Sequence, residues 1–327
     1  MDLPAELRKA LEIELGNQSP AALSKAAAAL SLRYRHQHAD GRSLLHSINE
    51  IQAYAAFRMP ATYAAVHAVL EQVRAVQKFN PNSLLDIGTG PGTVMWAAAE
   101  LYPDLKTIIL IERESEMIAL GKRLAKHSTR PVMQHAHWVQ ADVTRDWKVP
   151  VADLVTAAYV LGELDPKDRQ ALVQQLWQVT AGTLVLIAPG TPGGFACIRS
   201  AREQLLAAGG VVVAPCPHNL ECPIVGDDWC HFAQRVARTR LHRQLKAGDL
   251  AYEDEKYAYL AVSRQPGAAV SGRIIRHPQI RKGHVTLSVC EAAGISSRTI
   301  SRKDKELYRQ VKNLKWGSIF PGEASND

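Results

Sequence analysis

Three of the five cysteines in this 327-residue chain lie close together, as Cys216, Cys222 and Cys230 with the spacing C-x5-C-x7-C. The residues around them are rich in proline, glycine and aspartate, which is typical of a loop rather than of a buried strand. Packing therefore explains them poorly, and ligation of a metal explains them better. A structural zinc site usually contains a C-x2-C pair, which is missing here, whereas iron–sulfur clusters accept varied spacings. The spacing predicts a metal site and leaves the metal open.

Three thiolates are one ligand short of a closed site, and the sequence offers Cys290, His218 and His231 as the fourth. Cys197 falls in an expected helix, where an inert buried thiol is a simpler interpretation than a nucleophile for pyrimidine methylation. The odd number of cysteines and the lack of a secretory signal pattern indicate a cytoplasmic protein with reduced thiols, not a disulfide framework. There is no apolar run of about eighteen residues, so we expect no membrane association.

A glycine-rich loop, "DIGTGPGT" from Asp86 to Thr93, lies between an expected strand and an expected helix. Glycine permits φ > 0 and a close approach of the backbone to a ligand, as a nucleotide-binding turn requires. The spacing is Gly-x-Gly-x-Gly, not the Gly-x-Gly-x-x-Gly of dinucleotide-binding proteins. It resembles the first motif of the class I S-adenosylmethionine-dependent methyltransferases, in which an acidic residue opens the loop. The candidate cofactor-binding residues here are Asp86, Gly88, Thr89, Gly90 and Gly92.

Two further carboxylates fall where such a cofactor needs them. Glu112 is expected at the end of the second strand, where it can accept hydrogen bonds from ribose hydroxyls. Asp142 is expected at the end of the third strand, where the methyltransferases contact adenine. Together these positions favour S-adenosylmethionine over a nicotinamide cofactor, which is the main alternative. The catalytic residues are unknown, and the candidates are Tyr159 and Glu163, in a segment that lacks the Asn/Asp-Pro-Pro-aromatic loop of many amine methyltransferases.

The elements that must position these residues follow from hydrophobic periodicity. Residues 1–78 have helical spacing and form an N-terminal helical region, with a break expected near Pro60. Residues 79–265 alternate short apolar runs with helical stretches, which predicts an α/β fold with a parallel sheet and right-handed crossovers. Seven strands are expected, as in the Rossmann-like sheet of class I methyltransferases. The cysteine-bearing stretch 215–232 is then an insertion between the sixth and seventh strands.

Residues 266–327 are expected to form a small basic C-terminal module after a Gln-Pro-Gly boundary. From Arg264 to Lys315, twelve Lys and Arg stand against three Asp and Glu, a balance of +9; the whole chain carries +7. This regional asymmetry indicates a polyanionic partner, most simply RNA. We expect two short strands around a turn and then a partly helical segment. The candidate RNA-binding residues are Arg273, Arg276, Arg281, Lys282, His284, Arg302 and Lys303.

Several stretches carry a wider resemblance: "RMPATYAAV", "LLDIGTGPGT", "YVLGEL", "APGTPGGF", "CPHNLECP", "KYAYL" and "RHPQIRKGHVTLSVC". From about residue 40 to residue 317, the chain resembles a bacterial member of the methyltransferase-like family associated with the mitochondrial small ribosomal subunit. It departs from the family pattern at Ala188, where a Glu is expected. The resemblance implies a [4Fe–4S] cluster, with zinc as the alternative, on four ligands: Cys216, Cys222, Cys230 and Cys290.

The function implied by the resemblance is that of an S-adenosylmethionine-binding, iron–sulfur protein that acts on small-subunit ribosomal RNA or the assembling small subunit. Two alternatives stay open. One is a non-catalytic assembly factor that uses the methyltransferase fold as an RNA-binding platform, and the other is a small-molecule methyltransferase with a zinc site. A cluster that shares all four cysteines would hold the basic module on the core. We expect the protein to be a monomer.

Overall fold

The computed structural model describes residues 1–16, 19–36, 47–145, 147–237 and 252–322. Its centre is an eight-stranded sheet in the order β3-β2-β1-β4-β5-β8-β6, with β7 also paired to β8. Strands β1 to β5 run parallel, as expected, and β8 is antiparallel to β5. The strands are β1 (Ser83–Ile87), β2 (Thr107–Glu112), β3 (His137–Gln140), β4 (Ala152–Ala158), β5 (Thr180–Pro189), β6 (Val211–Ala214), β7 (Phe232–Ala237) and β8 (Tyr252–Ser263).

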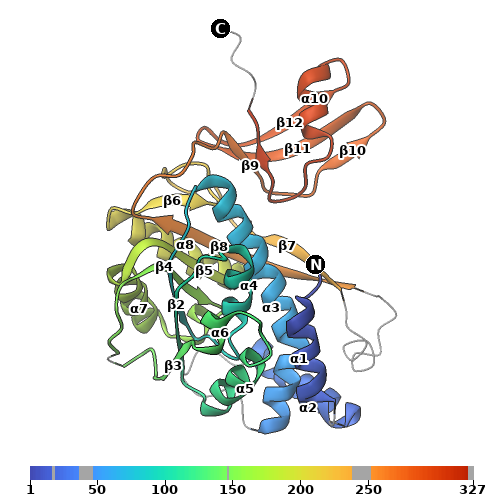
Figure 1. Ribbon diagram of the computed structural model, residues 1–327. Coiled ribbons are helices and arrows are strands. Elements are labelled where there is room, and N and C mark those ends of the chain that lie inside the picture. The colour runs from blue at the N-terminus through green and yellow to red at the C-terminus, as the bar shows by residue number, and fades with distance from the viewer. Residues whose placement is uncertain (17–18, 37–46, 146, 238–251, 323–327) are drawn as a thin grey trace.

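Helices cover both faces of this sheet (Figure 1). Successive strand residues face opposite sides, so Leu84 packs into one core and Leu85 into the other. The first core includes α3 (Ile48–Val76), α4 (Thr93–Leu101) and α5 (Ser115–Ala125). The second includes the 3-10 helix η1 (Leu161–Glu163), α7 (Pro166–Gln178) and α8 (Pro192–Ala207). This three-layer arrangement places the carboxyl ends of the parallel strands, and the predicted cofactor residues with them, at one edge.

The N-terminal region is helical, as predicted, with α1 (Ala5–Leu15) and α2 (Pro20–His36) packed beside α3. The break expected near Pro60 is wrong, because α3 continues through it. Proline inside a helix costs about 3 kcal/mol, yet Pro60 and most of its neighbours in α3 are buried against other elements. Tertiary packing therefore outweighs the missing hydrogen bond. The short α6 (Pro131–Gln134) completes the helices on this side. None of the described helices combines the length and apolar character needed to cross a membrane.

The expected seven strands are too few, because β8 is long enough to hold two partners on one edge. Its first half, Tyr252–Tyr257, pairs with β7, and its last residues, Ala261–Ser263, pair with β6. Strand β5 pairs with Tyr257–Ser263 and so occupies the opposite edge. Residues 215–231, called here the cysteine loop, leave β6 and return at β7 along the same edge of β8. The insertion predicted between two strands is therefore a loop above the middle of β8.

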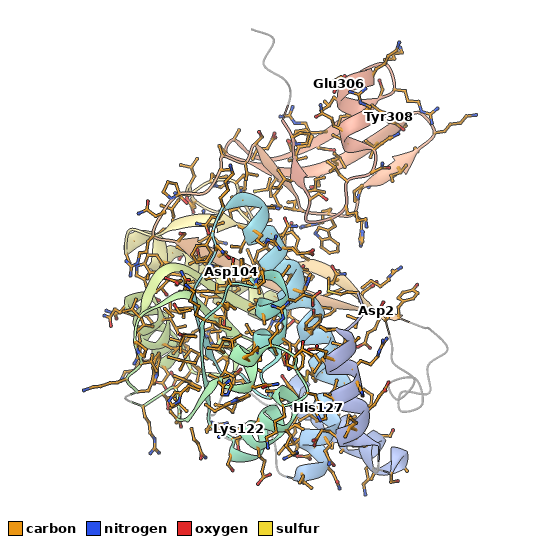
Figure 2. The ribbon with its side chains drawn as sticks, viewed as in Figure 1. Asp2, Asp104, Lys122, His127, Glu306 and Tyr308 are labelled. Atoms are coloured by element: carbon orange, nitrogen blue, oxygen red, sulfur yellow. The ribbon has the colours of Figure 1, made fainter. Side chains whose placement is uncertain are left out.

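The C-terminal residues form a second, five-stranded sheet, where two strands and a partly helical segment were expected. The order is β10-β11-β9-β13, and β12 also pairs with β11. In Figure 2, Glu306 and Tyr308 mark the helix α10 (Lys305–Val311) on the outer side of this module. Its core includes Ile274, Val285 and Leu287. The strands are β9 (Gly272–Ile274), β10 (Gln279–Arg281), β11 (His284–Glu291), β12 (Gly294–Ser301) and β13 (Ile319–Phe320).

Candidate functional site

The glycine loop joins β1 to α4 at the carboxyl edge of the sheet. Gly88, Gly90 and Gly92 have φ angles of 64°, 55° and 81°, which side chains other than glycine rarely adopt. A Cβ atom at Gly88 would lie 2.2 Å from Val160 Cγ2, whereas one at Gly90 would meet nothing closer than Tyr54 Oη, at 3.8 Å. Close packing therefore requires glycine at position 88, and backbone conformation requires it at position 90. Of the described residues, only Tyr54 lies within 4 Å of the Cβ position at Gly90.

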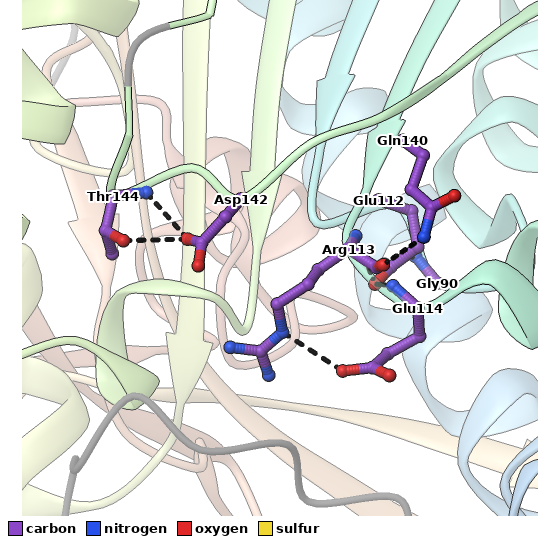
Figure 3. A network of polar contacts seen from close by, with 7 residues as sticks. All are labelled: Gly90, Glu112, Arg113, Glu114, Gln140, Asp142 and Thr144. Carbon is purple, nitrogen blue, oxygen red and sulfur yellow. Dashed lines mark hydrogen bonds and ion pairs between the residues drawn. The ribbon is translucent and has the colours of Figure 1, made fainter.

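Glu112 lies at the end of β2, as predicted, and its side chain is turned onto the loop. Its Oε2 accepts a hydrogen bond from the Gly90 amide at 2.7 Å, and its Oε1 accepts from the amides of Arg113 and Glu114 (Figure 3). Burial raises the pKa of this carboxyl, and the three amide donors oppose that rise. These contacts fix the carboxylate beside the backbone of the glycine loop.

Asp86 is fully buried in β1. Its Oδ1 accepts a hydrogen bond from Thr156 Oγ1 at 2.7 Å, and its Oδ2 has no hydrogen-bond partner among the described residues. Burial raises the pKa of the carboxyl to about 7, against opposing hydrogen bonds that include the one from Thr156. A buried oxygen without a partner is costly. This atom beside the glycine loop therefore suits a ligand that donates a hydrogen bond or carries positive charge.

Asp142 follows β3, two residues beyond its last residue, Gln140. Its Oδ1 accepts hydrogen bonds from the amide and the hydroxyl of Thr144, at 3.0 and 2.8 Å (Figure 3). Burial raises the pKa of this carboxyl, but the Thr144 bonds and the charge of Arg113 outweigh it and leave the pKa below its usual value. The register pairs Glu112 with Gln140, so Glu112 and Asp142 come from neighbouring strand ends.

Tyr159 follows β4 and is held by the chain's own residues. Its φ is 64°, and its hydroxyl donates to Glu255 Oε1 at 2.9 Å. Arg58 binds both oxygens of Glu255, at 3.2 and 3.1 Å. Burial, and then the Glu255 charge, raise the pKa of the Tyr159 hydroxyl well above its usual value. The candidate catalytic tyrosine is therefore a hydrogen-bond donor within a three-residue network.

Glu163 ends η1, and its carboxyl lies within electrostatic reach of Glu112. Burial, and then repulsion from Glu112, raise the pKa of Glu163 to about 7. The structure also adds Tyr54, Arg58 and Glu255, which sequence reasoning did not assign to this site. Tyr54 and Arg58 are four residues apart on α3 and so share a face of the helix. The quoted stretches "RMPATYAAV" and "KYAYL" pointed near Arg58 and Glu255, but they carried no stated role for either residue.

The four cysteines predicted as ligands line one cavity that is partly open to solvent. Cys290 comes from β11 of the C-terminal sheet, and its Sγ lies 4.0 Å from His218 Nε2 in the cysteine loop. Among the described residues, no three His, Cys, Asp or Glu side chains already converge as a metal-ligand set. Cys197 lies elsewhere, on α8, where it packs into the second core of the sheet. The structure thus gathers the four thiols around one space, without ligand geometry.

Burial raises the pKa of three of these thiols. The pKa of Cys230 lies well above its usual value and that of Cys290 is about 12, because burial and the neighbouring thiols both disfavour the thiolate. For Cys216, burial outweighs the lowering effect of Arg202. His231, an alternative fourth ligand, stacks on Trp229 with ring centroids 5.2 Å apart. Without a metal, these buried groups are therefore held as neutral thiols, and ligation to a metal would favour the thiolate form.

The predicted RNA-binding residues fall into two groups. Arg273 is only 1% exposed and donates to the carbonyls of Pro215 and Gly317, so its assignment as a phosphate contact is wrong. Arg276 binds Asp228 of the cysteine loop, at 2.5 and 2.6 Å. Both arginines belong to the C-terminal module and bind residues of the cysteine loop, so they hold the module on the core. His284 is half-buried. The four remaining residues are exposed: Arg281, Lys282, Arg302 and Lys303.

These exposed cations lie on two adjacent turns. The β10–β11 turn contains Lys282, and the turn after β12 contains Arg302. The Arg302 amide donates to the Gly283 carbonyl at 2.9 Å, and β11 and β12 pair His284 with Ser301. The two turns therefore present their positive charges together. We call Arg281, Lys282, Arg302 and Lys303 the basic turns.

The strand order and the glycine loop at the carboxyl edge define a class I S-adenosylmethionine-dependent methyltransferase fold. The family described as mitochondrial small ribosomal subunit Rsm22 matches residues 48–321, and the chain belongs to this family.

The chain is similar to the human mitochondrial ribosome assembly protein METTL17, with 29% identity over 82% of this chain and 62% of the relative. It is also similar to the mitochondrial Rsm22-cox11 tandem protein 1 of Schizosaccharomyces pombe, with 26% identity over 84% of this chain and 43% of the relative. It therefore spans less than two thirds of the length of these relatives. Among solved structures, magnesium protoporphyrin IX methyltransferase from Synechocystis aligns at a TM-score of 0.43, with 14% identity over 72% of this chain and 91% of that chain.

Proposed function

We propose that this protein binds S-adenosylmethionine and a [4Fe–4S] cluster and acts in assembly of the small ribosomal subunit, on its RNA or on the assembling particle. Family membership and the relatives named as ribosome assembly proteins support the assembly role. The observation that carries the cluster is the shared cavity, since three of its cysteines belong to the cysteine loop and the fourth to the basic module. The division of the chain at residues 78 and 265 is part of this proposal.

The residues at the glycine loop fit S-adenosylmethionine. The uncrowded Cβ position at Gly90 and the fixed carboxylate of Glu112 suit a ribose, and the partnerless Oδ2 of Asp86 suits the positive charge of the cofactor. Asp142 keeps its Oδ2 available beside them, because both Thr144 bonds go to Oδ1. When bound, the cofactor supplies an electrophilic methyl group. Calorimetric titration with S-adenosylmethionine tests this part, and the absence of binding would contradict it.

The residues at the cavity fit an anionic metal–thiolate group. Four thiols line one space, and burial disfavours the thiolate form of Cys216, Cys230 and Cys290. Ligation offsets that cost, because a metal holds cysteine as thiolate. When bound, the cluster supplies iron–thiolate bonds between the cysteine loop and β11. A reducing compartment, such as the cytoplasm expected from the sequence, keeps these thiols available.

The basic turns are the part of the module that we assign to RNA. They are exposed and side by side, and exposed Lys and Arg side chains bind phosphate without reading base sequence. Arg273 and Arg276 take no part in this contact, since they hold the module against the core. The cluster and these two arginines together would fix the orientation of the basic turns relative to the glycine loop.

A second candidate, a non-catalytic assembly factor, is favoured by the network around Tyr159. The Tyr159 hydroxyl, just after β4 in the region where methyltransferases place the methyl acceptor, is held by Glu255, which Arg58 binds in turn. Mass spectrometry of ribosomal RNA from a deletion strain separates the two candidates. A lost methyl group supports the enzyme, and an unchanged methylation pattern with defective subunit assembly supports the platform.

The experiment that tests the proposal as a whole is anaerobic purification of the full chain. We expect brown protein with about four irons per chain. Stoichiometric zinc without iron would overturn the cluster while leaving the cysteine ligands in place. Loss of metal from Cys290→Ser, with retention by Cys197→Ser, identifies the shared cavity as the site.

A further inference from the structure

The cavity of the four cysteines also contains buried positive charge. Arg202 is 4% exposed and Arg273 is 1% exposed, and both line the cavity. A guanidinium remains protonated in proteins, so each contributes a full charge. Among the described residues that line the cavity, there is no Asp or Glu side chain to balance them. A buried cation without an anion is costly, and the cavity is therefore electrostatically incomplete.

Each guanidinium uses some of its nitrogens to hold backbone and keeps one that is unused. Arg202 Nη2 donates to the carbonyls of His218 and Leu220, at 3.0 and 2.6 Å, within the cysteine loop. Arg273 Nε donates to the carbonyl of Pro215 at 2.8 Å, next to Cys216. Arg202 Nε and Arg273 Nη2 are buried without a hydrogen-bond partner among the described residues. Two donors are thus left over at the cavity that the thiols share.

We propose that Arg202 and Arg273 are positioning residues for the metal–thiolate group, whose negative charge they balance and whose sulfur atoms accept their unused N–H groups. This inference rests on the proposed [4Fe–4S] cluster. Hydrogen bonds to the sulfurs and nearby positive charge stabilise the reduced cluster, because reduction adds negative charge. The two arginines therefore raise the reduction potential of the cluster, in addition to holding the cysteine loop.

The test compares Arg202→Gln with Arg199→Gln. Arg199 lies one turn earlier on α8, also lines the cavity and also holds the loop, through the Ile224 carbonyl at 3.1 Å. Its charge, however, is offset by Glu203, and its side chain is 35% exposed. Each variant is purified anaerobically as the full chain, its iron is counted, and its midpoint potential is measured by optical titration with dithionite. Arg202→Lys, which keeps the charge, is measured in parallel.

We expect Arg202→Gln to keep its iron and to reduce at a more negative potential than the unaltered protein. Arg273→Gln should shift the reduction potential in the same direction. Arg202→Lys should have a potential close to that of the unaltered protein, and Arg199→Gln should leave the potential unchanged. Loss of iron from Arg202→Gln with retention by Arg202→Lys also supports a requirement for charge.

An unchanged potential in iron-loaded Arg202→Gln overturns the inference while leaving the cluster intact. An equal shift in Arg199→Gln, or loss of iron from both Arg202 variants, assigns the effect to the loop contacts and overturns it as well. Absence of iron from the unaltered protein is the distinct result that removes the cluster and this inference together.

Discussion

The Sγ of Cys290 lies 4.0 Å from the Nε2 of His218, although 72 positions separate the two residues in the chain. This contact joins β11 of the basic module to the cysteine loop of the core. It lies beside the Arg273 bond to Pro215 and the Arg276 pair with Asp228. The proposed cluster, the module and the loop therefore depend on one another.

The Cys290→Ser variant tests that dependence. We expect iron to fall from about four per chain to below one. The module should also loosen, because metal ligation is coupled to folding, and limited proteolysis between residues 264 and 272 should become faster. Cys197→Ser is the matched control, since Cys197 lies on α8 and packs into the second core, away from the other four cysteines' cavity. Equal iron in both variants would exclude Cys290 as a ligand.

Alteration of Gly90 to alanine tests the cofactor loop with little disturbance of packing. The φ of 55° is unfavourable for alanine by about 1–2 kcal/mol, although the new Cβ atom meets no close neighbour. We expect affinity for S-adenosylmethionine, measured by calorimetry, to fall at least about tenfold. Gly193→Ala, on α8 with open space around its Cβ position, is the control and should bind normally. Undiminished binding by Gly90→Ala would place the cofactor elsewhere.

The buried Asp86 carboxyl makes stability depend on pH. Its pKa is about 7 in the folded protein and about 3.9 when unfolded, so the folded state holds the proton more tightly. Its contribution to the free energy of unfolding is therefore complete below pH 4 and is lost as the pH rises toward 7. As the pH rises from 5 to 8, we expect the free energy of unfolding of Asp86→Asn to rise by about 2–3 kcal/mol relative to that of the unaltered protein. Urea denaturation at each pH measures this difference. A difference that does not vary with pH would show that this carboxyl titrates normally.

The Glu255→Gln variant tests the network around Tyr159. It leaves Arg58 without its bidentate anion, which should lower the free energy of unfolding by about 1–3 kcal/mol, since the Arg58 side chain is about a third exposed. Asp254→Asn, on the same strand, removes the exposed pair with Arg235 and should cost below about 1 kcal/mol. If both variants lose the same free energy of unfolding, the network around Tyr159 contributes no more than a surface ion pair.

Combined replacement of Lys282 and Arg302 by alanine tests the basic turns. We expect weaker binding to a small-subunit RNA fragment and a salt slope reduced by about 2, because about one counterion is released for each phosphate contact. Fluorescence anisotropy at several salt concentrations measures both quantities. Arg309→Ala is the control, since Arg309 is paired with Glu306 on α10. An unchanged slope in the double variant would move the RNA contact to another surface.

Local patterns in the sequence were sufficient for the parallel strands, the glycine loop and the position of Glu112 at a strand end. A strand or a glycine-rich turn is specified by residues that are neighbours in the chain, so hydrophobic periodicity and composition predict it directly. The same local rules were wrong where packing dominates. They predicted a break at Pro60, although burial of α3 keeps it helical, and they missed β7, whose pairing requires the distant first half of β8.

The sequence alone also determined which residue types could ligate a metal and that the positive charge gathers near the C-terminus. Only the tertiary structure decided which charges face solvent: it buried Arg273 beside the cysteines and left the basic turns exposed. It also brought Cys290 to the cysteine loop and placed Arg58 and Glu255 on Tyr159. These contacts join residues that are far apart in the chain. They result from strand pairing and from burial of apolar faces, which the spacing of residues within a short segment cannot predict.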